Sequence, residues 1–364
     1  MGKRSERKDI EGTKQGTSEK TMKKAGAEAG QGSAEKKRMK PGKVLGRVVL
    51  SVLLLAVLYL AVYLFGGPVF YAKFYKNAEK GVWIPGYEEG FVPQGVTALE
   101  GSFETLICGY MEGEENSRIY RVNVDGQVTQ IRLLREDGSP YTGHAGGFTI
   151  VGKYIYISNA QKIFVLDKEE VLNAWGVADI AFIGHFDVPC RASFCSSDGE
   201  MLYVGEYHKK GYETEESHKV DSADGVYQAM TFAYRLSYDG EFGIEDTTRP
   251  AAAYATCDIV QGFAMLPDGT AALSCSAGFA SSHLRFYDAG GEADSVFPFN
   301  GKAIPLYVLD CRRATRTVRM PRMSEDLEFR NGRLYIGFEG GAKKFGARML
   351  PFSMRNVMLY KYER

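Results

Sequence analysis

Residues 261–276 read QGFAMLPDGTAALSCS, and the same plan occurs five times between residue 94 and the C-terminus. A polar residue comes first, followed by a short run of small and apolar residues, a turn glycine and a run rich in β-forming residues. The other four copies begin at Gln94, His144, Arg191 and Glu325, and each polar residue lies seven or eight positions before its glycine. Such an internal repeat indicates a domain built from similar β-units.

The repeat predicts an all-β domain arranged as a propeller. The turn glycines are Gly101, Gly152, Gly199, Gly269 and Gly332. An inner strand, a hairpin and further strands, recurring at intervals of 47 to 70 residues, are the sequence form of propeller blades. Five blades fit this count, and the segment near residue 85 would supply the outermost strand of the last blade. A hairpin over 306–320 leaves six blades open, and a two-sheet sandwich is the structural alternative.

One long apolar run precedes the β-rich region. Residues 48–65 carry no charge, and as a helix they would span roughly 27 Å, close to the hydrocarbon thickness of a bilayer. We therefore expect a transmembrane signal-anchor helix over 44–67. A cleaved signal peptide is the alternative, but its apolar region is normally shorter and ends at a small-x-small site, which residues 63–67 lack.

The formal net charge of zero hides a strong asymmetry. Residues 1–47 contain fourteen Lys and Arg against six Asp and Glu, whereas the remainder contains 31 against 39. Basic residues before a membrane span predict a cytoplasmic N-terminus. We therefore expect a single-pass protein of the cell membrane with an extracellular C-terminal domain. The basic tail is interpreted as a topology signal with some lipid attraction, and no nucleic-acid partner is predicted.

These features divide the chain into four expected parts. A disordered basic cytoplasmic tail covers residues 1–43, because it has too few apolar side chains to fold. The membrane helix covers 44–67, a linker covers 68–85, and the extracytoplasmic propeller covers 86–364. Within the propeller, residues 208–226 form a long polar insertion, which is either a functional loop or a mobile surface segment.

The five leading polar residues form the candidate site. Innermost strands of a propeller converge on a central channel. We therefore expect the side chains of Gln94, His144, Arg191, Gln261 and Glu325 to meet at its mouth as ligand-binding residues. An arginine with a histidine and two amides suits a polar or anionic small molecule, such as a saccharide or a cell-wall component. The alternative is that these residues only line a solvated channel.

Several stretches carry a resemblance to a known family. QGVTALEG, GSPYTGHAGG, QGFAMLPDG and MSEDLEFRNGRLYIGFEGGAKKFG resemble a family of secreted or membrane-anchored bacterial propellers, over most of residues 90–364. More distantly, the blade plan is similar to gluconolactonase-type and phytase-type propellers. The gluconolactonase likeness implies a divalent metal at the channel mouth, where Glu325 matches a carboxylate ligand. Arg191 would place a permanent cation there, so calcium is disfavoured and neither a metal nor a cofactor is predicted.

Three functions stay open at this stage. The first is a binding module for an extracytoplasmic ligand, and the second is a hydrolase or lactonase in which Glu325 and His144 act as acid and base. The third is a protein-interaction scaffold in a membrane complex, since the fold alone does not choose among them. Residues 338–343 (FEGGAK) are a second candidate for ligand contact, with a plain turn as the alternative. The six cysteines are expected to form few or no disulfides.

Overall fold

A computed structural model describes residues 41–349 and 352–363 of the chain. The disorder expected for most of the basic tail therefore concerns residues outside this description. By its internal contacts the chain divides into two units, residues 1–54 and 55–364.

Helix α1 runs from Pro41 to Phe70, three residues beyond the predicted membrane helix at each end. Its segment Pro41–Tyr63 has a mean hydropathy of 2.5, and none of it is buried within the protein. The segment is long and apolar enough to cross a membrane. A signal sequence near an N-terminus has the same properties, so the helix is compatible with either a signal anchor or a signal peptide.

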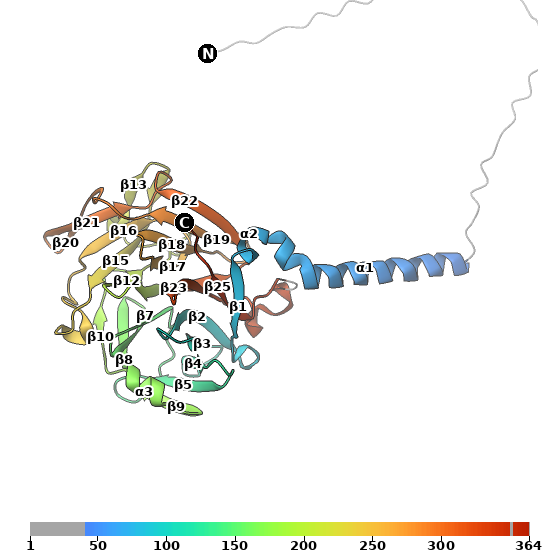
Figure 1. Ribbon diagram of the computed structural model, residues 1–364, viewed down its shortest axis with the longest axis horizontal. Coiled ribbons are helices and arrows are strands. Elements are labelled where there is room, and N and C mark those ends of the chain that lie inside the picture. The colour runs from blue at the N-terminus through green and yellow to red at the C-terminus, as the bar shows by residue number, and fades with distance from the viewer. Residues whose placement is uncertain (1–40, 350–351, 364) are drawn as a thin grey trace, which may run out of the picture. The chain divides into compact units, whose positions relative to one another are not determined.

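The remainder of the described chain is mainly β-structure and forms a five-bladed propeller (Figure 1). Blade 1 contains β2 (Phe91–Ala98), β3 (Thr105–Met111), β4 (Arg118–Val122), β5 (Val128–Leu134) and β9 (Val177–Ala181). Blade 2 contains β6 (Gly147–Val151), β7 (Tyr154–Asn159), β8 (Lys162–Asp167) and β10 (Gly184–Asp187). Blade 3 contains β11 (Phe194–Ser197), β12 (Met201–Gly205), β15 (Ala229–Arg235), β16 (Ala252–Thr256), β21 (Lys302–Val308) and β20 (Ser295–Phe299).

Blade 4 contains β17 (Val260–Met265), β18 (Thr270–Cys275), β19 (Ser282–Asp288) and β22 (Ala314–Met320). Blade 5 contains β23 (Ser324–Arg330), β24 (Arg333–Phe338), β25 (Asn356–Tyr360) and β1 (Ala78–Trp83). The short elements are α2 (Ala72–Tyr75), α3 (Lys168–Asn173), the hairpin β13 (Val220–Ser222) with β14 (Gly225–Tyr227), and the 3-10 turns η1 (Tyr87–Glu89), η2 (Glu216–His218), η3 (Glu241–Gly243) and η4 (Lys343–Met349).

The first strand of each blade lies innermost. Strands β2, β6, β11, β17 and β23 contact one another in that order, and β23 returns to β2, which closes the ring at five. Because inner strands are enclosed by their neighbours, every residue of β2 is buried. In the outer strand β5, buried residues instead alternate with exposed or partly exposed ones, as in a strand with one buried face. The ring thus brings the starts of all five inner strands to one end of the channel.

The predicted hairpin turns are confirmed. All five turn glycines have a positive φ, with values of 71° at Gly101, 56° at Gly152, 92° at Gly199, 82° at Gly269 and 73° at Gly332. A residue with a side chain is strained in this region of backbone space, which explains why glycine stands at the same point of each repeat. The repeat found in the sequence is therefore the blade hairpin itself.

The N-terminal and C-terminal parts of the propeller share blade 5. Strand β1 pairs with the last strand β25, with Ala78 opposite Tyr360 and Trp83 opposite Asn356. This closure was predicted for the segment near residue 85, and the strand ends two residues before that position. Pairing the first and last strands of the propeller in one sheet leaves β25 without an open edge.

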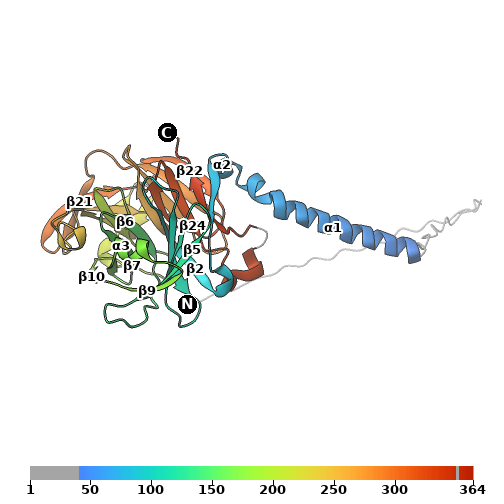
Figure 2. The same ribbon diagram turned by 60° about the horizontal axis from the view of Figure 1, so that its bottom comes forward.

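The 306–320 hairpin does not make a sixth blade. Its first half lies in β21, which pairs in parallel with β16 and extends blade 3 outward, and its second half is β22, the outer strand of blade 4. Strand β9 extends blade 1 in the same way, by parallel pairing with β5. Both added strands, β9 and β21, lie at the outer rim in the two views of Figures 1 and 2. Strands β9 and β21, which are not part of the sequence repeat, therefore pair with the outer edges of blades 1 and 3.

Candidate functional site

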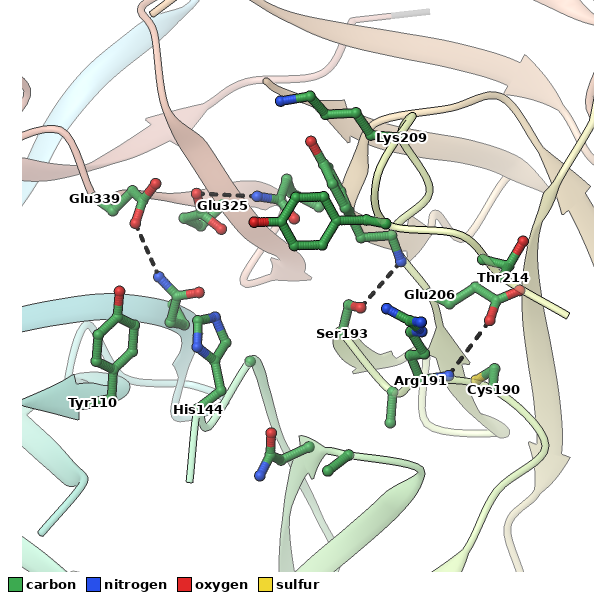
Figure 3. Close-up of a pocket in the computed structure, with 18 of the residues that line it drawn as sticks. Tyr110, His144, Cys190, Arg191, Ser193, Glu206, Lys209, Thr214, Glu325 and Glu339 are labelled. Carbon is green, nitrogen blue, oxygen red and sulfur yellow. Dashed lines mark hydrogen bonds between the residues drawn. The ribbon is translucent and has the colours of Figure 1, made fainter. Parts of the chain in front are cut away.

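A pocket of about 950 Å³ opens at the end of the channel where the inner strands begin. All five leading polar residues line it: Gln94, His144, Arg191, Gln261 and Glu325. Figure 3 shows Glu325 on one side of the pocket with His144 near it, and Arg191 on the other side. The structure thus brings the five residues into one cavity, and their binding of a ligand stays a prediction.

These side chains come from two kinds of backbone position, within an inner strand or in the loop before one. Gln94, Gln261 and Glu325 lie within inner strands, whereas His144 and Arg191 each lie three residues before one. The residues that follow His144 and Arg191 are Ala145 and Ala192, with φ of 51° and 49°. A left-handed backbone at a residue other than glycine costs of the order of 1 kcal/mol, and such strain is often found at functional sites.

The second strands of three hairpins add residues that are not among the five leading polar residues. Tyr110, Glu206 and Glu339 line the pocket near the ends of second strands. In an antiparallel hairpin the end of the second strand lies opposite the start of the first, as Tyr110 lies opposite Val92. The signal was therefore available, because the residue that pairs with an inner-strand start must face the same mouth. Of these three, only Glu339 falls in a segment that the sequence argument had named, 338–343.

Glu325 and Glu339 form a hydrogen-bonded pair of carboxyl groups. Gln261 Nε2 donates to Glu325 Oε1 at 3.3 Å, and Gln94 Nε2 donates to Glu339 Oε2 at 3.3 Å. Burial raises the pKa of Glu325 well above its ordinary value, and the nearby Glu339 raises it further, while Lys344 opposes the change. A hydrogen bond between two carboxyl groups needs one proton, so the pair retains a proton at pH values where exposed glutamates have lost theirs.

His144 lies in a cluster with Tyr110 and Lys344. The rings of His144 and Tyr110 stack with their centroids 4.7 Å apart, and Lys344 Nζ donates a hydrogen bond to the Tyr110 hydroxyl. Desolvation, with repulsion from Lys344, lowers the pKa of His144 to about 4. The imidazole is therefore uncharged at neutral pH. Within the described residues, no hydrogen bond joins His144 to Glu325, the acid–base pair considered from the sequence.

Arg191 brings an unpaired guanidinium to the pocket. Its side chain is exposed, and the guanidinium makes no ion pair or hydrogen bond with any residue that the structure describes. Its backbone N–H donates to Glu206 Oε2 at 3.4 Å. Glu206 is itself buried and accepts a hydrogen bond from His218 Nδ1 at 2.5 Å. The acidic neighbour is thus occupied elsewhere, which leaves the Arg191 guanidinium available to a ligand.

The polar insertion over 208–226 forms one wall of the pocket. Its residues Lys209 and 212–215 line the cavity. His208 is 3 % exposed and holds the segment from both ring nitrogens, Nδ1 at 2.8 Å from Asp258 Oδ1 and Nε2 at 3.1 Å from Glu213 Oε2. The insertion is therefore packed against the propeller at the pocket, and its role in binding stays a prediction.

The donor set at the mouth does not fit a calcium site. Of the five glutamates that line the pocket, Glu325 and Glu339 lie together, and the positive charge of Lys344 acts on both. Calcium needs six to eight oxygen ligands with several ionised carboxylates among them. Among the described residues, no group of three or more His, Cys, Asp or Glu is placed to hold a metal ion.

No family model and no curated protein matches this chain. Solved structures do match. An oxidoreductase of Thermus thermophilus, described as a glucose dehydrogenase, is 15% identical with a TM-score of 0.39, over 78% of this chain and 98% of that one. The PQQ-bound aldose sugar dehydrogenase of Streptomyces coelicolor is 14% identical with a TM-score of 0.40, over 77% of this chain and 95% of that one.

Hydrazine synthase of Kuenenia stuttgartiensis is 13% identical with a TM-score of 0.32, over 67% of this chain. This chain spans about half of that protein's length, 55%. Likenesses of this size are distant similarities of β-propeller architecture and say nothing about the ligand. The strand pairing described above defines the class of protein, a mainly-β five-bladed propeller with an N-terminal apolar helix.

Proposed function

We propose that this protein is a membrane-anchored module that binds a saccharide-like ligand with an anionic group in its central pocket. The observation that carries the proposal is the free guanidinium of Arg191 across the pocket from paired amide and carboxyl groups. Arginine binds carboxylates and phosphates through two parallel hydrogen bonds. Amides and carboxyls suit the hydroxyl groups of a sugar, since they donate and accept.

Aromatic rings in the lining support a sugar-like ligand. Tyr212 and Phe279 line the pocket and are 57% and 49% exposed. Large aromatic side chains that stay exposed in a cavity offer apolar faces to the C–H faces of a bound ring. The pocket of about 950 Å³ has room for an oligosaccharide fragment. Polar edges and aromatic faces together favour a ring that carries hydroxyl groups.

Binding to a panel of neutral and acidic cell-wall saccharides tests the proposal. We expect acidic saccharides to raise the melting temperature of the detergent-solubilised chain, because a ligand that binds only the folded state stabilises it. Arg191→Ala should weaken their binding about tenfold or more in titration calorimetry, as loss of a charge-assisted hydrogen bond does. Arg132→Ala is the control, since Arg132 forms an exposed ion pair with Asp179 outside the pocket. Equal binding by the two variants would refute the central site.

The paired carboxyls favour an enzyme as the second candidate. Glu325 and Glu339 share a proton within the pocket, and such a pair can supply one acid and one base to a bound substrate. In a hydrolase or lactonase, Glu325 and Glu339 would then act as acid and base, in place of Glu325 and His144. Turnover of a saccharide or lactone that disappears in Glu325→Gln while binding persists would select the enzyme. A scaffold would instead bind a protein and none of these ligands.

A further inference from the structure

Two buried cysteines meet at the junction of blades 3 and 4. Cys257 follows β16 and is 8% exposed, whereas Cys275 is the last residue of β18 and is fully buried. Their sulfur atoms are 3.9 Å apart. A disulfide bond is about 2.05 Å long, so closing it needs a sulfur displacement of roughly 2 Å, within reach of side-chain rotation. Neither residue lines the central pocket.

The surroundings of this pair activate one of the two sulfurs. Arg285 Nη1 donates to Cys257 Sγ at 3.4 Å. A hydrogen bond from the Cys275 thiol lowers the pKa of Cys257 to about 7, helped by the charge of Arg285 and opposed by burial. The thiolate is the nucleophilic form of cysteine, and a neighbouring arginine increases its fraction. Cys257 is therefore the attacking thiol of the pair.

The remaining buried cysteines lack such surroundings. Cys108, Cys190 and Cys195 direct their thiols to the carbonyl oxygens of Ala145, Val204 and Tyr156. Burial raises the pKa of each of them. Among the described cysteines, the sixth, Cys311, is the exposed one. These four sulfurs supply internal controls for the pair.

We propose that Cys257 and Cys275 are a covalent modification site that forms an intramolecular disulfide when a low-molecular-weight disulfide acts as the oxidant. The Cys257 thiolate attacks one sulfur of the oxidant, which leaves as a thiolate, and a mixed disulfide forms on Cys257. The Cys275 thiol then loses its proton, attacks Cys257 Sγ and releases the second thiolate. Two protein thiols are oxidised, and one disulfide is reduced to two thiols.

The bond would join two parts of the propeller that already contact each other. Cys257 belongs to the connection from blade 3 to blade 4, and Cys275 ends the second strand of blade 4. The disulfide would close a loop around β17 and its hairpin. Closing such a loop restricts the unfolded chain more than the folded one. The oxidised protein should therefore melt at a higher temperature than the reduced protein.

The experiment treats the intact, reduced, full-length chain with 2-hydroxyethyl disulfide without denaturant, followed by alkylation of free thiols under denaturing conditions. Trypsin then releases residues 236–285 as one peptide, because the sole arginine inside it precedes Pro250, and Cys257 and Cys275 are its two cysteines. We expect this peptide to lose two hydrogens and to carry no alkyl group. Peptides with Cys190 and Cys195 should stay alkylated, and dithiothreitol should reverse both the mass change and the rise in melting temperature.

Variants separate this site from general oxidation. Cys190→Ser should form the 257–275 disulfide as the wild type does, and Cys275→Ser should stop at a mixed disulfide on Cys257. Arg285→Gln should slow the reaction several-fold, because the thiolate loses its neighbouring charge. A wild-type peptide that stays doubly alkylated, or that stops at a mixed disulfide on Cys257, would overturn the proposal.

Discussion

At the scale of single residues, the carboxyl groups of β23 show how position along the channel sets their chemistry. Glu328 lies deep in the channel, where it accepts hydrogen bonds from Thr97, Thr149, the Ser197 backbone at 3.3 Å and Arg330 at 2.8 Å. These donors come from four blades, so Glu328 holds the ring together. Glu325, three residues earlier, lies at the pocket and bonds to Gln261 and to Glu339. Its protonation can therefore respond to solvent pH and to a ligand.

Glu325 should make the stability of the propeller depend on pH. Its pKa is raised in the folded state, so its stabilising effect is complete below about pH 4.5, the ordinary value, and is lost as the pH rises through the raised pKa. Glu325→Gln keeps the size and removes the titration. We expect the melting temperature of the variant, relative to wild type, to rise as the pH increases above about 4.5 and to level off once the pH passes the raised pKa.

His144, in the same pocket, should give stability a pH dependence of the opposite sign. Its pKa is lowered from 6.5 to about 4, so its contribution is lost as the pH falls through that interval. His144→Gln should therefore gain stability relative to wild type toward acid pH, in thermal unfolding scans under the same buffers. Parallel curves for the wild type and both variants would contradict the two assigned shifts.

At the scale of elements, the sequence predicts the strands that belong to the repeat but not the elements outside it. The hairpin of each blade recurs with its glycine, so the inner strands and Gln94, His144, Arg191, Gln261 and Glu325 follow from spacing alone. Strands β9 and β21 add to blades by parallel pairing, for which the repeat holds no signal. Lys344 reaches the pocket from the turn η4, outside any strand. Its place depends on tertiary packing, which local sequence does not specify.

Strand β1 and helix α2 should belong energetically to the propeller. Phe74 in α2 is fully buried against the core of blades 4 and 5, and β1 completes blade 5. A chain that starts at Tyr71 should keep the melting temperature of the full protein within a few degrees. A chain that starts at Ile84 should melt much lower and self-associate, because it loses a buried aromatic side chain, worth about 3–5 kcal/mol, and exposes the edge of β25. If the two chains have equal melting temperatures and the shorter one is monomeric in size-exclusion chromatography, β1 and α2 do not stabilise the propeller and belong to the linker.

At the scale of the whole molecule, the charge of the chain and the helix α1 make one joint prediction. The basic excess lies before the apolar segment Pro41–Tyr63, and the acidic excess lies after it. Positive charges before a span retain the N-terminus in the cytoplasm. The proposed topology is therefore a cytoplasmic tail, one membrane crossing and a propeller outside the cell, where cell-wall saccharides are accessible.

Cys311 offers a direct test of that topology. Among the six cysteines it is the exposed one, and it lies in the propeller between β21 and β22. A membrane-impermeant maleimide should label it on intact cells as fully as after lysis, and Cys311→Ser should abolish the labelling. Labelling that needs lysis would place the propeller inside and remove cell-wall ligands from consideration. A labelled protein that is shorter than the full chain and released from the membrane would show that the apolar segment is a cleaved signal peptide. The propeller would then be a secreted binding module.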